Sequence, residues 1–245
     1  IMTTIENNLQ DVRDRVAAAF DRSERSLTSV TLLAVSKTFG PEAVAQALAA
    51  GQTAFGENYI QEGVEKILAL RTSHPDATAE WHCIGPVQSN KTRLVAAHFH
   101  WVQSVDRLKI AQRLSEQRPD GLPPLQVCLQ VNVDGGANKS GVTPEETLAL
   151  AHAVAGLPNL RLRGLMCIPE PAEGFEAQRM LFLRAKVLFD DLNARGFGLD
   201  TLSMGMSEDL EAAIAAGSTM VRVGRAVFGH RPRKEALTSS AAGPV

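Results

Sequence analysis

The chain has 245 residues, of which 44% are hydrophobic and 21% are charged, and its formal net charge is -2. These proportions are typical of a globular protein that buries its core in one large α/β domain or two small ones. The small net charge argues against nucleic acid or an anionic membrane as a bulk electrostatic partner, and no apolar stretch is long enough to span a bilayer.

The first half of the chain alternates strand and helix after an opening amphipathic helix, whose apolar face carries Ile5, Leu9, Val12, Val16 and Phe20. The predicted elements that follow are a strand over 31–37, a helix over 41–51, a strand over 53–56, a helix over 60–70, a strand over 81–84, a helix over 91–97, a strand over 101–105 and a helix that ends near Pro119.

The second half repeats this order. It predicts a strand over 125–133, a helix over 144–155, a strand over 160–168, a long helix with Leu181, Ala185, Leu188 and Leu192 on one stripe, a strand over 201–206, a helix over 207–216 and a strand over 219–223. The strands are continuous apolar runs, which is typical of a parallel sheet covered by helices. About eight βα units in this length predict a single (β/α)8 TIM barrel with an extra N-terminal helix. A doubly wound open sheet is the alternative, although the first βα turn lacks a GxGxxG sequence.

No linker or change in composition divides the chain, so we predict one barrel domain over residues 2–230 and a flexible tail over 231–245. The cysteines Cys83, Cys128 and Cys167 each fall in an apolar, strand-like segment, and none is part of a CxxC pair. This pattern favours buried, reduced thiols over a metal site or a disulfide framework. Reduced thiols in turn predict a cytoplasmic protein.

Lys37 is the first candidate for chemistry, because it stands where the apolar run from Thr31 to Val35 ends. A lysine that is desolvated at the end of a strand loses affinity for its proton and becomes a nucleophile that can form a Schiff base with a carbonyl. Most lysines in such positions are solvated surface residues. In a barrel, however, the ends of the strands build the face that carries the working residues.

The loops after the last two predicted strands are the usual phosphate site of such barrels. Here they contain Ser207, which can cap the following helix, and Gly224, which allows close backbone approach to a ligand. The amide groups of Gly224 and Arg225 can then point at a phosphate. A plain helix cap at Ser207 and a plain strand end at Gly224 are the alternatives, and Glu208 would repel a phosphate unless it points away.

Arg222 lies on the last strand, and strand alternation places it toward the barrel interior if Val221 and Val223 face the helices. A buried arginine needs acceptors or a ligand. A Schiff-base lysine, a phosphate cup and an inward arginine together resemble a pyridoxal phosphate site. In such a site the arginine would keep the pyridine nitrogen unprotonated and weaken the ring as an electron sink.

Several motifs occur in the order typical of one family: 32–38 (LLAVSKT), 55–59 (FGENY), 81–91 (WHCIGPVQSNK), 163–166 (RGLM) and 202–207 (LSMGMS). On these motifs the chain resembles the YggS/PROSC family of pyridoxal phosphate homeostasis proteins, over essentially residues 31–229. The resemblance implies a fold-type III barrel with Lys37 as the Schiff-base lysine. It also implies that Ser207, Gly224 and Arg225 hold the phosphate, that Arg222 faces the pyridine nitrogen and that Asn58 is a further cofactor-binding residue.

Two positions depart from the family pattern. Many relatives have threonine or serine where this chain has Arg225, whose backbone N–H can still contact the phosphate. Relatives often carry a second lysine two residues after the first, and this chain has Phe39 there. A step of cofactor transfer that uses the second lysine would therefore differ in this protein.

The leading hypothesis is a monomeric carrier that buffers pyridoxal phosphate or delivers it to pyridoxal-phosphate-dependent apo-enzymes, without catalysing a reaction. The first alternative is a racemase or decarboxylase that uses the same cofactor. Racemases on this barrel add a β-domain that supplies a catalytic tyrosine, whereas we expect no such domain here, and the single tyrosine is Tyr59. His82 is another candidate acid, although a hydrogen-bonded packing role is more typical. The second alternative is a Schiff-base aldolase for a phosphosugar, which would need no cofactor.

Overall fold

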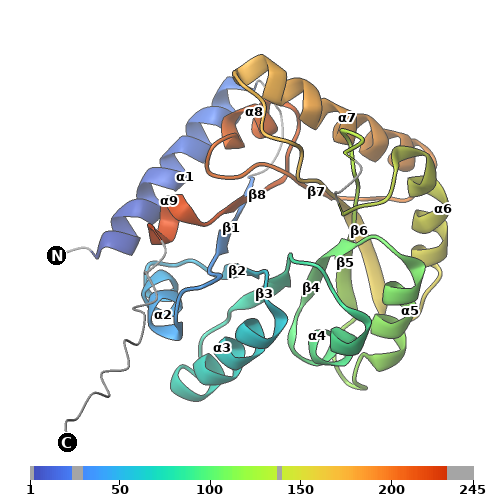
Figure 1. The fold of residues 1–245 in the computed structure, drawn as a ribbon. Helices are drawn as coiled ribbons and strands as arrows, with labels where there is room; N and C mark the ends of the chain where they lie inside the picture. Colours follow the sequence, from blue (N-terminus) through green and yellow to red (C-terminus); the bar gives the residue numbers. More distant parts are fainter. Residues whose placement is uncertain (1–2, 24–29, 137–139, 231–245) are drawn as a thin grey trace, which may run out of the picture.

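The strands of the protein close into a barrel in the order β1 to β8, with neighbouring strands parallel. The computed structural model describes residues 3–23, 30–136 and 140–230. Leu33 of β1 pairs with Arg222 of β8, so the barrel leaves no sheet edge open. Figure 1 shows the helices arranged in a ring around the strands. The predicted (β/α)8 barrel is therefore confirmed, and the open-sheet alternative is wrong.

The elements follow one another in strict strand and helix alternation after the first helix. The strands are β1 (Thr31–Val35), β2 (Ala54–Glu57), β3 (Glu80–Cys83), β4 (Trp101–Val105), β5 (Leu125–Gln130), β6 (Leu160–Met166), β7 (Thr201–Ser203) and β8 (Met220–Val223). The α-helices are α1 (Thr4–Arg22), α2 (Pro41–Ala49), α3 (Ile60–Ser73), α4 (Thr92–His98), α5 (Leu108–Gln117), α6 (Pro144–Ala155), α7 (Phe175–Ala194), α8 (Leu210–Ala215) and α9 (Arg225–Phe228). A short 3-10 helix, η1 (Ser89–Lys91), precedes α4.

The extra helix α1 packs on the outside of the barrel against α2, α8 and α9 (Figure 1). It begins with a capping box between Thr3 and Glu6. Leu9, Val12 and Val16 of the predicted apolar stripe are buried, while Ile5 and Phe20 at its two ends are half-buried against the same core. Two of its polar side chains reach the segments that follow β7 and β8: Arg15 donates to the Ser207 carbonyl oxygen (3.0 Å) in the loop after β7, and Asn8 donates to the Val227 carbonyl oxygen (2.9 Å) in α9. The helix therefore supports the loops that build one end of the barrel.

The strand side chains separate into an outer and an inner set. Outward residues such as Ala34, Val221 and Val223 join the large core between strands and helices. Inward residues of the same strands, Leu33 and Met220 among them, form a smaller apolar cluster inside the barrel. Arg222 alternates with Val221 and Val223 and is 4% exposed, so its predicted inward orientation is confirmed.

Two helix predictions need correction. The buried stripe of α7 is Phe182, Ala185, Phe189 and Leu192, one residue away from the predicted stripe at two of its four positions. Helix α8 starts at Leu210 and not at Ser207, because the Asp209 carboxylate accepts the backbone N–H of Met206 and forms a turn there. Ser207 therefore does not cap α8. The predicted tail over 231–245 lies outside the described residues.

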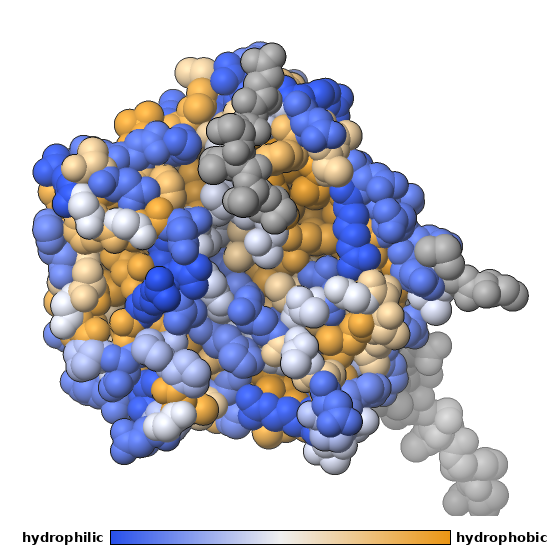
Figure 2. All heavy atoms as spheres, turned by 180° about the vertical axis from the view of Figure 1, so that it is seen from behind, coloured by the Kyte–Doolittle hydropathy of each residue, from blue (hydrophilic) through white to orange (hydrophobic). Residues whose placement is uncertain are grey.

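No helix in the described part of the chain has the length and apolar character needed to cross a membrane. The surface on the far side of the view in Figure 1 carries hydrophilic residues interspersed with hydrophobic ones (Figure 2).

Candidate functional site

A cavity of about 910 Å³ lies at the end of the barrel where the carboxyl ends of the strands meet. Its size is in the range of small-ligand pockets, which is roughly 300–1,000 Å³. The last residues of the strands and the loops after them form its walls. All the residues predicted to bind a cofactor line this one cavity: Lys37, Asn58, Ser207, Arg222, Gly224 and Arg225.

Lys37 lies in the loop between β1 and α2, half-buried, and both of its chain neighbours are held by hydrogen bonds. The Ser36 hydroxyl donates to Glu57 Oε1 (2.6 Å), and the Thr38 backbone N–H donates to Glu62 Oε1 (2.6 Å). Thr38 has φ 70°, a left-handed conformation that is unusual for a β-branched residue. Such a conformation persists only where its surroundings hold it.

A buried ion pair stands behind this loop. Lys66 Nζ lies 2.5 Å from Glu57 Oε1 and donates to the Ser36 carbonyl oxygen (2.8 Å). The side chains of Lys66 and Glu57 are 3% and 0% exposed. Burial raises the pKa of Glu57, while Lys66 lowers that pKa and so opposes the rise. We call Ser36, Glu57, Glu62 and Lys66 the lysine-loop clamp, since together they hold the backbone on both sides of Lys37.

The loops after β7 and β8 bring backbone groups to the other side of the cavity. A Cβ atom at Gly224 would lie 3.2 Å from the Val35 carbonyl oxygen, so the close approach of β8 to β1 favours glycine there. Gly224 also precedes α9, whose first N–H groups have no partner within the helix. The Arg225 side chain is exposed and donates to Glu208 Oε1 (3.2 Å).

Arg222 closes the floor of the cavity. Its Nη1 donates to the Ser203 hydroxyl (2.8 Å) and its Nη2 donates to the Cys167 carbonyl oxygen (2.9 Å). Burial lowers the pKa of Arg222, yet an arginine remains charged in proteins. The guanidinium therefore brings a positive charge to the base of the cavity.

Asn58 carries a buried oxygen, Oδ1, without a hydrogen-bond partner among the described residues. Such an atom in the wall of a cavity is a candidate ligand contact, since buried polar groups are nearly always paired. The neighbouring loop of β3 depends on Gly85, because a Cβ atom there would collide with the Asn58 carbonyl oxygen. The Gly85-Pro86 motif thus packs closely against the residue that follows β2.

Other residues singled out in the sequence lie elsewhere. His82 is fully buried inside the barrel, hydrogen-bonded to Glu80 and Gln103, so its predicted packing role is confirmed. Tyr59 is 52% exposed at the start of α3 and does not line the cavity. The three cysteines are buried thiols, as predicted. Among the described residues, no cluster of acidic, histidine or cysteine side chains could hold a metal ion.

The structure also adds residues that the sequence analysis missed. Ile168 and His230 line the cavity without a local sequence signal, and only their position after β6 and α9 indicates a place at this end of the barrel. Ile84 and Met206, which lie inside the 81–91 and 202–207 motifs, line the cavity as well.

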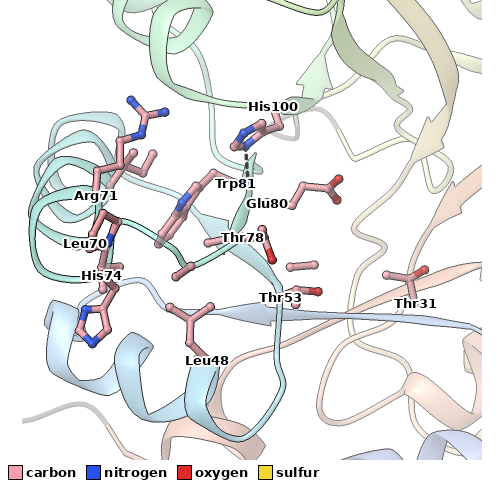
Figure 3. Close-up of a pocket in the computed structure, with 15 residues that line it drawn as sticks. Thr31, Leu48, Thr53, Leu70, Arg71, His74, Thr78, Glu80, Trp81 and His100 are labelled. Atoms are coloured by element: carbon pink, nitrogen blue, oxygen red, sulfur yellow. Dashed lines mark hydrogen bonds between the residues drawn. The ribbon is translucent and has the colours of Figure 1, made fainter.

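A second hollow, of about 760 Å³, lies at the opposite end of the barrel. Figure 3 shows that Thr31, Thr53 and Glu80, at or next to the first residues of β1, β2 and β3, line it together with Arg71 and His100. The ends of α2 and α3 that face this hollow are C-terminal, which disfavours an anion. No lysine lines it. The chemistry predicted from the sequence therefore belongs to the first cavity.

The fold and the cavity define a (β/α)8-barrel protein with a lysine and an arginine at the carboxyl ends of its strands. The family described as "Alanine racemase, N-terminal domain" matches residues 5–232. A pyridoxal phosphate homeostasis protein of Pseudomonas aeruginosa is 59% identical over 94% of this chain and 97% of its own length. The protein of the same name from Escherichia coli K12 is 53% identical over 94% of this chain and 98% of its own length. The chain belongs to the YggS/PROSC family of pyridoxal phosphate homeostasis proteins, within this wider group.

Solved structures agree with this assignment. PipY of Synechococcus elongatus, solved with pyridoxal phosphate bound, is 33% identical to this chain and has a TM-score of 0.79. The match covers 92% of this chain and 100% of PipY. The alanine racemase of Corynebacterium glutamicum is 16% identical, with a TM-score of 0.63 over 91% of this chain and 62% of its own. At that identity the likeness shows the fold alone.

Proposed function

We propose that this protein binds pyridoxal phosphate in the cavity of about 910 Å³ and buffers or delivers it in the cell, without a reaction of its own. The observation that carries the proposal is the convergence of Lys37, Arg222 and the Ser207 and Gly224 loops on one cavity. Relatives named for pyridoxal phosphate homeostasis, and PipY with the compound bound, support it.

The residues present fit this cofactor. Pyridoxal phosphate supplies an aldehyde that condenses with a lysine amine, and Lys37 is the one lysine among the described residues that line the cavity. Its phosphate calls for N–H and hydroxyl donors with close backbone approach, which Ser207, Gly224 and the amide of Arg225 offer. The unpartnered Asn58 Oδ1 is a further contact for a ligand.

The arginine at the floor favours a carrier over an enzyme. Arg222 donates hydrogen bonds and cannot accept one, so a ring nitrogen that faces it stays unprotonated. An unprotonated pyridine withdraws electrons weakly, which disfavours carbanion chemistry on the bound cofactor.

Racemisation would in addition need proton donors on both faces of the substrate carbon. Apart from Lys37 and the two arginines, the titratable groups that line the cavity within the described residues are Glu208, which pairs with Arg225, and His230. Both are exposed, so neither is held on a chosen face.

The cellular setting belongs to the same proposal. Three buried, reduced thiols suit a reducing compartment, and we expect the protein to work in the cytoplasm as a monomer. Its recipients are expected to be pyridoxal-phosphate-dependent apo-enzymes.

Borohydride reduction of the protein loaded with pyridoxal phosphate tests the proposal. Mass spectrometry of the peptides should find the pyridoxyl group on Lys37, and Lys37→Ala should lose both the label and the yellow colour. Lys91→Ala is the matched control and should retain both. A label mainly on Lys91 or Lys139 would overturn the assignment, and a colourless protein that is not labelled at all would favour the phosphosugar aldolase.

A further inference from the structure

A continuous line of hydrogen-bonded polar side chains crosses the interior of the barrel beneath the cavity. Arg222 Nη1 donates to Ser203 Oγ (2.8 Å), Ser203 Oγ donates to Gln103 Oε1 (2.6 Å), and Gln103 Nε2 lies 2.8 Å from His82 Nδ1. His82 Nε2 lies 2.8 Å from Glu80 Oε1. We call this set, Arg222, Ser203, Gln103, His82 and Glu80, the barrel relay.

The relay joins parts of the chain that are far apart in sequence. Its members come from β8, β7, β4 and β3, and Ser203 is 100 positions from Gln103. Ser203, Gln103 and His82 are all 0% exposed. Glu80, at the far end, is half-exposed and lines the hollow drawn in Figure 3. The relay therefore runs from the floor of the cavity to the opposite end of the barrel.

The chemistry of the two ends dictates the direction of every bond between them. An arginine can only donate and an ionised carboxylate can only accept. Ser203 must accept from Arg222, so its own proton goes to the Gln103 oxygen. The Gln103 amide then donates to His82 Nδ1, which leaves the imidazole proton on Nε2, directed at Glu80. One order of donors and acceptors satisfies the whole line.

The surroundings of His82 agree with this direction. Burial lowers the pKa of His82, which favours the neutral ring that the relay requires, although Glu80 raises that pKa in opposition. The ring also stacks on Trp101, with centroids 4.9 Å apart, and Arg163 lies over the same Trp101 ring. A neutral ring avoids a further buried charge in this group.

We infer that the barrel relay positions the Arg222 guanidinium toward the bound ring, and that Gln103 and His82 are positioning residues for it. This inference rests on the proposed function for its ligand. A long arginine side chain has many rotamers, and the hydrogen bonds to Ser203 and to the Cys167 carbonyl oxygen select one of them. Gln103 in turn holds the Ser203 hydroxyl, since that hydroxyl would otherwise turn to another acceptor.

The test compares Gln103→Met with Gln52→Met. Gln52 is also buried, and it donates to the carbonyl oxygens of Leu32 and Ala54 outside the relay. Both substitutions remove a buried amide of similar volume. We expect Gln103→Met to raise the Kd for pyridoxal phosphate about 10-fold and to shift the absorption maximum of the bound cofactor, because the charge at its ring nitrogen moves. Gln52→Met should change neither. An unchanged Kd and spectrum in folded Gln103→Met would overturn the inference.

A double-mutant cycle separates positioning from a general loss of packing. If Gln103 acts through Arg222, Gln103→Met should add nothing to the loss caused by Arg222→Ala, since the group it positions is gone. Additive losses in Kd would show that Gln103 acts by another route and would overturn the inference.

A measurement on the protein without cofactor tests the barrel relay independently of the proposed function. In 15N NMR spectra of protein labelled at histidine, His82 should be neutral with its proton on Nε2. The Nδ1 resonance of His82 should shift in Gln103→Met, which removes the donor to that atom, but not in Gln52→Met. A proton on Nδ1 in the wild type would overturn the relay. A protein that binds no pyridoxal phosphate but shows the expected His82 state would instead refute the proposed function.

Discussion

Substitution of Lys66 by methionine is the sharpest perturbation of the lysine-loop clamp. Methionine matches the length and volume of the lysine stem but removes the charge opposite Glu57 and the donor to the Ser36 carbonyl oxygen. Glu57 then keeps the Ser36 hydroxyl as its hydrogen-bond partner, while its Oε2 atom has no partner among the described residues even in the intact pair. A carboxylate that is 0% exposed would be left without a counter-charge.

The expected cost follows from that geometry. Removal of one partner from a buried ion pair costs about 3–5 kcal/mol of unfolding free energy, because the other charge stays buried. For a chain of this size, each kcal/mol shifts Tm by about 2–4 °C, so Tm should fall by about 6–20 °C. Lys186→Met is the matched control: its pair with Asp190 lies on the surface, where such pairs contribute about 0–1 kcal/mol.

The loss of stability in Lys66→Met should depend on pH, and the pKa of Glu57 determines the direction of that dependence. Burial raises the pKa of Glu57 above its unfolded value, and loss of Lys66 raises that pKa further. The variant's folded state therefore binds a proton more tightly than its unfolded state. That contribution to stability is complete below the unfolded pKa, about 4.3, and is lost as the pH rises through the folded pKa. The stability gap between Lys66→Met and wild type should accordingly be larger at pH 8 than at pH 5.

Urea unfolding of the two variants and of wild type at pH 5 and pH 8 provides the measurement. Addition of Glu57→Gln to Lys66→Met should recover at least about 2 kcal/mol, because it removes the unpaired charge. A loss below about 1 kcal/mol in Lys66→Met, or a gap that does not depend on pH, would refute the view that a desolvated ion pair holds the Lys37 loop.

Three further outcomes are expected. Ser207→Ala should raise the Kd for pyridoxal phosphate about 10–150-fold and leave Tm unchanged, because a hydrogen bond to a charged group contributes about 1.5–3 kcal/mol. An unchanged Kd with a lower Tm would show that Ser207 has a structural role instead. In deuterated water, the loaded protein should convert no L-alanine to the D form by chiral chromatography, and turnover of about 1 per second or more would contradict the carrier function. Burial raises the pKa of Cys83 and of Cys128 to about 12, so iodoacetamide should label neither thiol at pH 8 until the protein is unfolded. Rapid labelling of the native protein would contradict this and would show that the barrel opens.

Local signals in the sequence determined the order of the elements and much of their extent. Helix α6 has its predicted bounds, because Thr143 and Glu146 form a capping box around Pro144 at its start. The continuous apolar strands required a parallel sheet covered by helices, and their number predicted the barrel. The barrel in turn predicted that Lys37, Arg222 and Gly224 share one end, since the carboxyl ends of all strands meet there.

Where two helical patterns in the sequence were equally good, the tertiary structure decided which residues are buried and where the helix begins. In α7, both the row of Leu181 and Leu188 and the row of Phe182 and Phe189 have helical spacing, and packing on the barrel buries the second row. Near Ser207 the sequence permits a helix, but the hydrogen bond between Asp209 and the Met206 N–H delays it. Neither outcome depends on residue type alone.

The polar groups inside the fold were decided entirely by tertiary structure. Lys66 lies close to glutamates on a helix, a pattern typical of a solvated surface residue. In the fold, α3 packs the Lys66 side chain against Glu57, and that side chain is only 3% exposed. Gln103 and Ser203 lie in apolar strands without any local signal, and they meet only because the barrel closes and places β4 opposite β7. Periodicity in a sequence reports which face of an element is buried, whereas the partner of a buried polar group is set by contacts between distant segments.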